Sequence, residues 1–426
     1  MGMLTEDTKA IILLCGVLGE KASVTPLSQT EYTRLVHWLM GNKLRPSSLL
    51  EPTYIKEAAS GAGLDEKRLD TLLARGTQLG FAVENWQRNG IWVISRSDSD
   101  YPVRYKQHLK KKAPPLLFGV GERSLLQGGG LAMVGSRNVD AMGETFTRKV
   151  ARLCAEASMP VVSGGARGVD QISMESALDV GGTSIGILAD SLLKKSLGKK
   201  FRKALADKRL LLISPYHPEA PFKAWAAMGR NKLIYTMADF ALVVSSDHNK
   251  GGTWAGATEE LKREYSIPVF TRIEKTVPKG NEKLLEIGAI QWPEPMSAKN
   301  MGSILHSTAK SFVEKQKQNN ATLFDQAVQS SQSVQQANDK VTKRELNTKP
   351  IPEKSEPKEE NHSKPSVYDV VLPVILEELS LPTSATDLAE KLDIQKAQLN
   401  IWLKKAFEEK QIKKLTQPVR YAKLEK

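Results

Sequence analysis

The stretch VVSGGARGVDQISMESAL, residues 161–178, decides the fold. A short apolar run ends in a glycine-rich corner at residues 163–168, and the pattern of an amphipathic helix begins at about Asp170. Glycines at such a corner let the backbone come close to a bulky anion. The first turn of the helix directs its unpaired N–H groups and the positive end of its dipole at the same point. Arg167 adds a planar fork of donors that fits a phosphate. The segment therefore predicts a phosphate site.

Short apolar runs alternate with amphipathic helices on both sides of this corner. Strands are expected at 91–94, 131–134, 159–162, 183–188, 210–214, 240–245 and 268–270, the last of which closes the series, with helices at 143–157 and 170–180. This alternation is typical of a parallel sheet covered on both faces. The sequence thus predicts the α/β class, with a Rossmann-like, doubly wound and mostly parallel sheet. Ligands of such sheets bind at the carboxyl ends of the strands.

The composition divides the chain of 426 residues into four parts. Residues 1–88 predict a helical N-terminal module, and residues 89–308 predict the Rossmann-like domain. Residues 309–366 are rich in Gln, Lys, Glu, Asn, Ser and Pro, which indicates a disordered linker. Residues 367–426 have the pattern of three helices and a hairpin, which predicts a winged-helix domain that binds DNA or protein.

Charge and cysteine content limit the functions to consider. The net charge is +13, from 61 Lys and Arg against 48 Asp and Glu, which favours a polyanionic partner. The two cysteines, Cys15 and Cys154, are expected to be buried free thiols. No Cys or His cluster has metal-ligand spacing, so neither a metal nor a cofactor is expected. The apolar run 10–18 is too short to span a bilayer, and we expect a cytoplasmic protein without membrane contact.

Three further stretches place cations where strands of the predicted sheet end. MVGSRN (133–138) contributes Arg137, MGRNKLI (228–234) contributes Arg230 and Lys232, and SSDHNKGGTWAGATEE (245–260) contributes Lys250 in a glycine-rich loop. Simpler interpretations are a surface arginine on a tight turn and an ordinary solvated pair. Trp254 is able to stack on a base, although most tryptophans belong to the core. Cations at four corners of one sheet edge exceed what a mononucleotide needs and suit a run of backbone phosphates.

The motifs SGGARGVD (163–170), MVGSRN and GRNKLIY (229–235) resemble those of the DprA/Smf family, the DNA-processing proteins of natural transformation, and they occur in the family's order. The similarity extends over about residues 90–275. It implies binding of single-stranded DNA, a homodimer, and loading of a RecA-type recombinase. The chain departs from the family at Met174, where a His is usual, and at residues 227–228, where a Phe-Pro pair is usual. Residues 250–253 replace the family's Ser-Gly-Ser loop.

The resemblance maps the family's phosphate pocket onto one set of residues, and the glycine-rich corners add others. The resemblance gives Gly135, Ser136, Arg137, Ser163, Gly164, Arg167, Gly168, Asp170, Arg230, Asn231 and Lys232. The corners add Gly165, Lys250, Gly251, Gly252 and Thr253. No catalytic residue is expected among them.

Three functions remain open from the sequence. The first is a non-enzymatic protein that binds single-stranded DNA in DNA uptake, recombination or protection. The second is a nucleotide hydrolase, because the Gly-Gly-Thr run and the later Glu259 and Glu260 are similar to LOG-type nucleotide phosphoribohydrolases. The third is a sensor or adaptor whose sheet holds a small nucleotide while the C-terminal domain contacts a partner.

Overall fold

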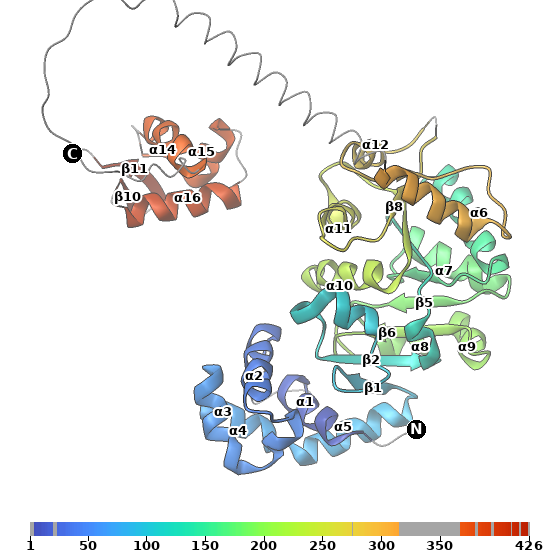
Figure 1. Cartoon of the computed structure of the whole chain (residues 1–426), viewed down its shortest axis with the longest axis horizontal. Helices are drawn as coiled ribbons and strands as arrows, with labels where there is room; N and C mark the ends of the chain where they lie inside the picture. The colour runs from blue at the N-terminus through green and yellow to red at the C-terminus, as the bar shows by residue number, and fades with distance from the viewer. Residues whose placement is uncertain are drawn as a thin grey trace, which may run out of the picture. The chain divides into compact units, whose positions relative to one another are not determined.

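The computed structural model describes residues 4–19, 24–274, 276–314, 367–379, 382–392, 396–409, 411–416 and 419–424 (Figure 1). The chain divides into two compact units, Met1–Val334 and Gln335–Lys426, each of which is described by itself. Within the described ranges, none of the helices combines the length and the apolar character that crossing a bilayer requires.

The described residues up to Arg88 fold mainly into helices. They are α1 (Glu6–Cys15), α2 (Gln29–Gly41), α3 (Ile55–Ala62), α4 (Glu66–Leu73) and α5 (Gly76–Arg88), with the short turns η1 (Pro46–Leu50) and η2 (Pro52–Tyr54) before α3. Capping explains where the first two begin, since the Thr5 hydroxyl accepts from the Thr8 amide and Ser28 forms a capping box with Glu31. Leu35, Leu39 and Leu69 belong to the core between the helices.

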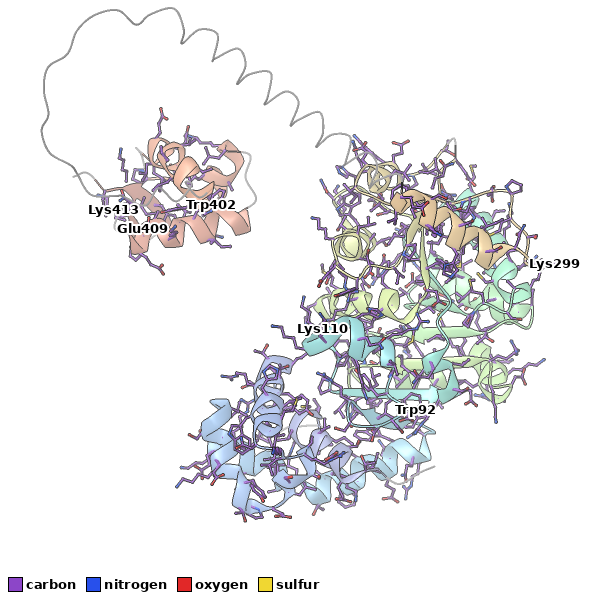
Figure 2. The ribbon with its side chains drawn as sticks, viewed as in Figure 1. Trp92, Lys110, Lys299, Trp402, Glu409 and Lys413 are labelled. Atoms are coloured by element: carbon purple, nitrogen blue, oxygen red, sulfur yellow. The ribbon has the colours of Figure 1, made fainter. Side chains whose placement is uncertain are left out.

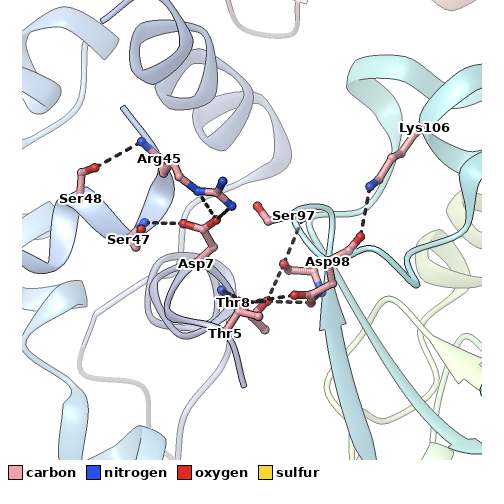
Figure 3. Close-up of polar contacts among 10 residues, drawn as sticks. Thr5, Asp7, Thr8, Arg45, Ser47, Ser48, Ser97, Asp98 and Lys106 are labelled. Carbon is pink, nitrogen blue, oxygen red and sulfur yellow. Dashed lines mark hydrogen bonds and ion pairs between the residues drawn. The ribbon is translucent and has the colours of Figure 1, made fainter. Parts of the chain in front are cut away.

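Polar contacts join α1 to the first strand of the sheet (Figure 3). The carboxylate of Asp98 accepts hydrogen bonds from the hydroxyls of Thr5, at 2.9 Å, and Thr8, at 2.7 Å. On the other side of α1, Asp7 forms an ion pair with Arg45. The contacts of Asp98 hold the helical module against the sheet domain, whereas the ion pair joins two parts of the module itself.

One sheet of nine strands forms the centre of the first unit. The strands are β1 (Trp92–Ser95), β2 (Leu116–Gly121), β3 (Leu131–Gly135), β4 (Val161–Ser163), β5 (Ser184–Ile187), β6 (Leu210–Ser214), β7 (Phe240–Ser245), β8 (Val269–Thr271) and β9 (Ile290–Gln291). Their order is β1-β2-β6-β5-β4-β3-β7-β8-β9. The pairs from β6 to β9 are parallel, whereas β1 and β2 add an antiparallel edge. The predicted α/β class with a mostly parallel sheet is confirmed, although β9 extends the sheet beyond the strand expected to close it.

Helices cover both faces of this sheet. They are α6 (Ala141–Glu156), α7 (Val169–Asp179), α8 (Leu192–Ser196), α9 (Lys199–Ala206), α10 (Ala224–Met237), α11 (Gly251–Leu261), α12 (Lys279–Glu286) and a helix over residues 301–314. Alternate residues of β3 face opposite sides, so that Met133 packs in the core with α6 and α7, and Val134 packs in the core with α10 and α11. Burial on both faces explains why the strands read as continuous apolar runs.

The helix over residues 301–314 corrects the predicted end of the domain at residue 308. Met301, Leu305 and Ala309 are buried on the first unit's core, and Phe312 packs against it. The polar composition after residue 309 concealed this periodic apolar face. The rest of the predicted linker, residues 315–366, lies outside the described residues.

The second unit has the predicted element order of three helices and a hairpin. It contains α14 (Val367–Glu378), α15 (Ala385–Lys391), α16 (Lys396–Glu408), β10 (Ile412–Thr416) and β11 (Val419–Lys423). Ile375, Leu388 and Leu403 are fully buried in its core, and Trp402 packs against this core. The assignment as a winged helix stays a prediction.

The strand order creates a natural place for a ligand. From β3 the chain moves through β4 and β5 to β6, and then returns to β7 on the other side of β3. Crevices in such sheets form at the carboxyl ends of the strands where the order reverses, which here are β3 and β7.

Candidate functional site

Two adjoining hollows open at this reversal. The larger, of about 550 Å³, is lined by residues 134–137 after β3, residues 245–247 after β7, one side of α10 and the start of α11. The smaller, of about 370 Å³, is lined by residues 164–167 after β4 and by Asp190 and Lys195 after β5. Arg137, Ala166, Phe222 and Arg230 line both hollows. The carboxyl ends of four parallel strands therefore contribute to one joined depression.

Arg230 is the buried cation between the two hollows. Its side chain lies on α10 and only 5% of the residue is exposed, yet Nε and Nη1 have no hydrogen-bond partner among the described residues. Burial lowers the pKa of Arg230, and the nearby carboxylate of Asp170 opposes that effect. An arginine stays protonated in spite of such a shift. A buried charge with unused donors is costly, so this position favours an anion as an additional partner.

Gly164 makes room for that guanidinium. A Cβ atom added at Gly164 would lie 1.5 Å from Nη1 of Arg230, which is far inside any van der Waals contact. A side chain at this position would therefore displace the guanidinium of Arg230. The sequence predicted a close approach at this corner, but attributed it to the ligand.

Asp170 holds the corner in place. Its buried carboxylate accepts hydrogen bonds from the backbone N–H groups of Gly164 and Ala166. Burial raises the pKa of Asp170, whereas Arg230 and these two amides lower it. A carboxylate next to a phosphate would repel it, so Asp170 positions the loop and Arg230. Asp170 also lines the larger hollow, and its assignment as a phosphate-binding residue stays a prediction.

Glycines also bring the corners after β3 and β4 together. Gly168 has a φ of 85°, and a Cβ atom there would lie 2.3 Å from the carbonyl oxygen of Ser136. A Cβ atom at Gly135 would lie 2.5 Å from the side chain of Val169. Gly165 has a φ of 63°, which turns the corner between β4 and α7. The two loops form one wall.

The start of α11 faces the larger hollow. Residues 250–253, namely Lys250, Gly251, Gly252 and Thr253, line it, and the last three form the first turn of the helix. The side chain of Asn231 donates from Nδ2 to the carbonyl oxygen of Gly252 at 2.9 Å, which fixes this turn against α10. The unpaired N–H groups of a helix start and its dipole attract an anion.

Exposed cations surround the hollows. Arg137 lies with its guanidinium carbon 5.1 Å from the ring centroid of Phe222, where it borders both hollows. Arg167 lines the smaller hollow and donates to the side chain of Asn138. With Lys250, these residues and Arg230 are the four cations that the sequence places at one edge. The structure brings all four to the joined depression.

Three predicted site residues line neither hollow, namely Gly168, which packs against Ser136 as described above, Ser163 and Lys232. The hydroxyl of the fully buried Ser163 donates to the carbonyl oxygen of Met133 at 2.6 Å, so it links β4 to β3. Lys232 lines neither hollow, because α10 begins at Ala224 and turns Lys232 toward Glu259 on α11. The sequence predicted a corner at residues 229–232, whereas these residues lie inside the helix.

The structure adds site residues that the sequence interpretation missed. Lys195 on α8 faces the smaller hollow, pairs with Asp190 at 3.6 Å and donates to the carbonyl oxygen of Gly165 at 3.3 Å. Burial lowers the pKa of Lys195, and Asp190 opposes that effect. Phe222, which lines both hollows, is 49% exposed, and Trp225, which follows Ala224 of the larger hollow, is 63% exposed. The sequence feature that could have identified them is a pair of aromatic residues in the segment between β6 and α10.

Trp254 and the two acids considered for catalysis lie outside the hollows. Trp254 packs on the core, with its ring centroid 4.9 Å from that of His248. Glu260 is buried, pairs with Arg263 at 2.6 Å and accepts from the Ile267 amide. Glu259 is exposed beside Lys232. Within the described ranges, no group of three or more His, Cys, Asp and Glu residues is arranged to hold a metal ion.

The fold and the site define an α/β protein of the Rossmann-like type with a depression lined by cationic side chains at its topological switch point. Residues 92–300 match the family described as DNA recombination-mediator protein A. The α/β domain of this chain therefore belongs to the DprA/Smf family.

Relatives and a solved structure agree with this assignment. The DNA processing protein DprA of Bacillus subtilis is 26% identical over 189 residues, which are 43% of this chain and 62% of that protein. The protein Smf of Escherichia coli is 25% identical over 281 residues, which are 64% of this chain and 71% of that protein. The crystal structure of DprA from Streptococcus pneumoniae aligns with a TM-score of 0.55 and 19% identity, over 70% of this chain and 98% of that one, and thus shares the fold.

Proposed function

We propose that this protein binds single-stranded DNA along the two joined hollows and acts as a DNA-processing protein. One observation carries the proposal, namely the buried guanidinium of Arg230, whose Nε and Nη1 have no hydrogen-bond partner among the described residues. A backbone phosphate in the larger hollow would supply acceptors for it. The start of α11 and the exposed Arg137 would bind the same or the next phosphate.

Single-stranded DNA fits better than a duplex. The cations lie inside hollows at the end of a sheet, where a flexible single strand can bend to follow them. Phe222 and Trp225 expose aromatic faces beside the hollows, and unpaired bases stack on such faces. Membership of a family described as DNA recombination-mediator protein A supports a nucleic acid over another polyanion.

The direct test is Arg230→Met, measured as the affinity for labelled oligo-dT at moderate salt. We expect a loss of about 1–3 kcal/mol, which is roughly a 5–150-fold weaker Kd, because a charge-assisted phosphate contact is removed. Arg88→Met on the exposed face of α5 is the matched control and leaves the affinity unchanged. Equal affinities for Arg230→Met and the unchanged protein, with both folded by thermal unfolding, would contradict the proposal.

We further propose that binding is not coupled to hydrolysis. Support comes from Glu259 and Glu260, which do not line either hollow. Incubation with AMP and chromatography for free adenine tests this point. Release of adenine that Glu259→Gln abolishes would favour a nucleotide phosphoribohydrolase instead.

A nucleotide sensor is the second candidate function. The volume of the larger hollow, about 550 Å³, lies within the range of roughly 300–1,000 Å³ usual for small-molecule sites. Mononucleotides that raise the melting temperature while oligo-dT does not would support the sensor.

Recombinase loading, a role in DNA uptake and a homodimer are finer proposals that rest on the family. Assembly of a RecA-type filament on single-stranded DNA, with and without this protein, tests the first. Transformation frequency after deletion of the gene tests the second. Light scattering of the purified chain tests the homodimer.

A further inference from the structure

A run of three lysines forms an exposed turn near the start of the sheet domain. The turn η4 (Lys110–Lys112) follows the short helical turn η3 (Tyr105–Leu109), and all three of its side chains are exposed. Among the residues that the structure describes, no carboxylate forms an ion pair with these lysines. We call η4 the lysine turn.

The lysine turn is held in a defined place. Gln29 on α2 donates from Nε2 to the carbonyl oxygens of Lys111, at 3.3 Å, and Ala113, at 2.9 Å. Lys110 has a φ of 50°, a conformation unusual for a residue other than glycine. A backbone held in this way presents three exposed lysines that have no carboxylate partner among the described residues, which suits a partner with repeated negative charge.

An aromatic ring lies among these cations. Tyr265, which follows α11, is 54% exposed. The ammonium nitrogen of Lys110 lies 5.2 Å from the centroid of the Tyr265 ring. The ring centroid of His108, on η3, lies 6.4 Å from the same point. Lys262 is exposed three residues before Tyr265. Basic side chains interleaved with an exposed aromatic are typical of a nucleic-acid surface.

Lys232 connects this surface to the larger hollow. It follows Asn231, which lines that hollow, and partial burial lowers its pKa. Glu259 raises the pKa of Lys232, while the charges of Lys112 and Arg263 lower it further. The geometry agrees, because the Tyr105 hydroxyl of η3 donates to the carbonyl oxygen of Leu233, the residue after Lys232 on α10, at 3.0 Å. The exposed acids at this surface are Glu259 and Glu264, since Glu260 is buried in its pair with Arg263.

We propose that Lys232, the lysine turn, Lys262 and Tyr265 form an outer strip that binds the sugar–phosphate backbone of the single strand after it leaves the larger hollow across α10. This inference rests on the proposed function, because it assigns the path of the same strand. It also gives a role to Lys232, which lies outside the hollows. Figure 2 labels Lys110 on the side of the sheet domain next to the helical module and Lys299 on the opposite side of the view.

The strip and the hollows differ in how they bind. Arg230 makes a buried and directional contact, whereas exposed lysines act mainly by neutralising phosphates and releasing counterions. Each phosphate neutralised on a single strand contributes about 0.7 to the slope of log K against log salt. The strip should therefore matter only for a strand long enough to reach it, and its contribution should weaken with salt.

The test compares the full chain with Lys110→Gln/Lys111→Gln/Lys112→Gln on oligo-dT of about 4 and about 20 nucleotides over a salt titration. For the longer strand we expect the salt slope to fall by about 2 and the affinity to fall several-fold at low salt. For the shorter strand we expect no change. Lys56→Gln/Lys67→Gln/Lys299→Gln removes the same charge from exposed lysines elsewhere and should leave both strands unaffected.

Each other outcome has a separate meaning. If the triple variant binds the longer strand with unchanged affinity and an unchanged salt slope, the outer strip does not bind DNA. An acidic protein would then be the partner to consider for these lysines. An equal loss on both lengths also contradicts the outer strip, because the change would then act through the hollows. If the unchanged protein binds neither length, the proposed function itself fails.

Discussion

The guanidinium of Arg230 occupies the space that a side chain at position 164 would need. The position of this charge therefore depends on the absence of a side chain at Gly164 as well as on the arginine itself. Asp170 completes this arrangement by holding the amides of the same corner. At the scale of single residues, the depression is a buried cation placed by a glycine and a carboxylate.

Gly164→Ala should therefore act on both stability and binding. The new methyl group would displace Arg230, and we expect a loss of about 1–3 kcal/mol in the free energy of unfolding. The affinity for oligo-dT should fall with it, as measured by fluorescence anisotropy. Gly41→Ala, where a Cβ atom meets nothing within 4 Å, is the matched control: it should leave the affinity unchanged and should not lower the free energy of unfolding, because alanine favours the helix in which it lies. A folded Gly164→Ala protein with unchanged binding would contradict the role given to Arg230.

Trp225 should matter for binding and not for folding. Its side chain is 63% exposed and its ring lies edge-on to that of Tyr216, with centroids 5.6 Å apart. Trp225→Ala should weaken oligo-dT binding by about 1–3 kcal/mol if a base stacks there. The melting temperature should stay the same. Phe81→Ala, at a residue that is 69% exposed on α5, provides the comparison, and equal affinities of the two variants would exclude stacking at Trp225.

At the scale of elements, helix starts organise both the site and the N-terminal module. The start of α11 is fixed by Asn231 and faces the larger hollow. The start of α2 is fixed by its capping box, in which Glu31 also pairs with Arg68 of α4 at 2.6 Å. The hydrogen bond from Arg68 is the main reason that the pKa of Glu31 is lowered to about 2.

This pairing predicts a pH dependence of stability. The folded-state pKa of Glu31 lies below the unfolded value, so its contribution is present above about pH 4.5 and is lost as the pH falls toward 2. We expect Glu31→Gln to cost about 2 kcal/mol of unfolding free energy at pH 7. The difference between the two proteins should shrink as the pH approaches 2, as measured by urea unfolding. A constant difference across this range would show that the loss comes from capping and packing alone.

At the scale of the whole molecule, the alternation of apolar runs and helices was enough to predict the α/β sheet. It also grouped Arg137, Arg167, Arg230 and Lys250, because the carboxyl ends of parallel strands share one edge. The sequence interpretation missed the start of α10 because the residue at its N-cap is Lys223, whose side chain forms no capping hydrogen bond and so gives no sequence signal. This error misplaced Lys232. Lys195 reaches the site only through long-range packing, which no local pattern records.

The same scale defines where the first unit ends. The helix over residues 301–314 packs Ala309 and Phe312 on the core. The free energy of unfolding of a chain that ends at residue 308 should therefore be about 1–3 kcal/mol lower than that of a chain that ends at residue 314. Denaturant unfolding of the two truncated proteins measures this difference. Equal free energies of unfolding would support the end of the domain at residue 308, as predicted from composition.

The measurement that tests the central claim most directly is the salt dependence of oligo-dT binding by the full chain and by Arg137→Ala/Arg230→Met. We expect tight binding that falls steeply with salt, and a slope that is smaller by about 1.4 in the double variant because two phosphate contacts are lost. The thermal unfolding of both proteins serves as the check on folding. Identical slopes and affinities for the two folded proteins would mean that the strand does not pass through these hollows.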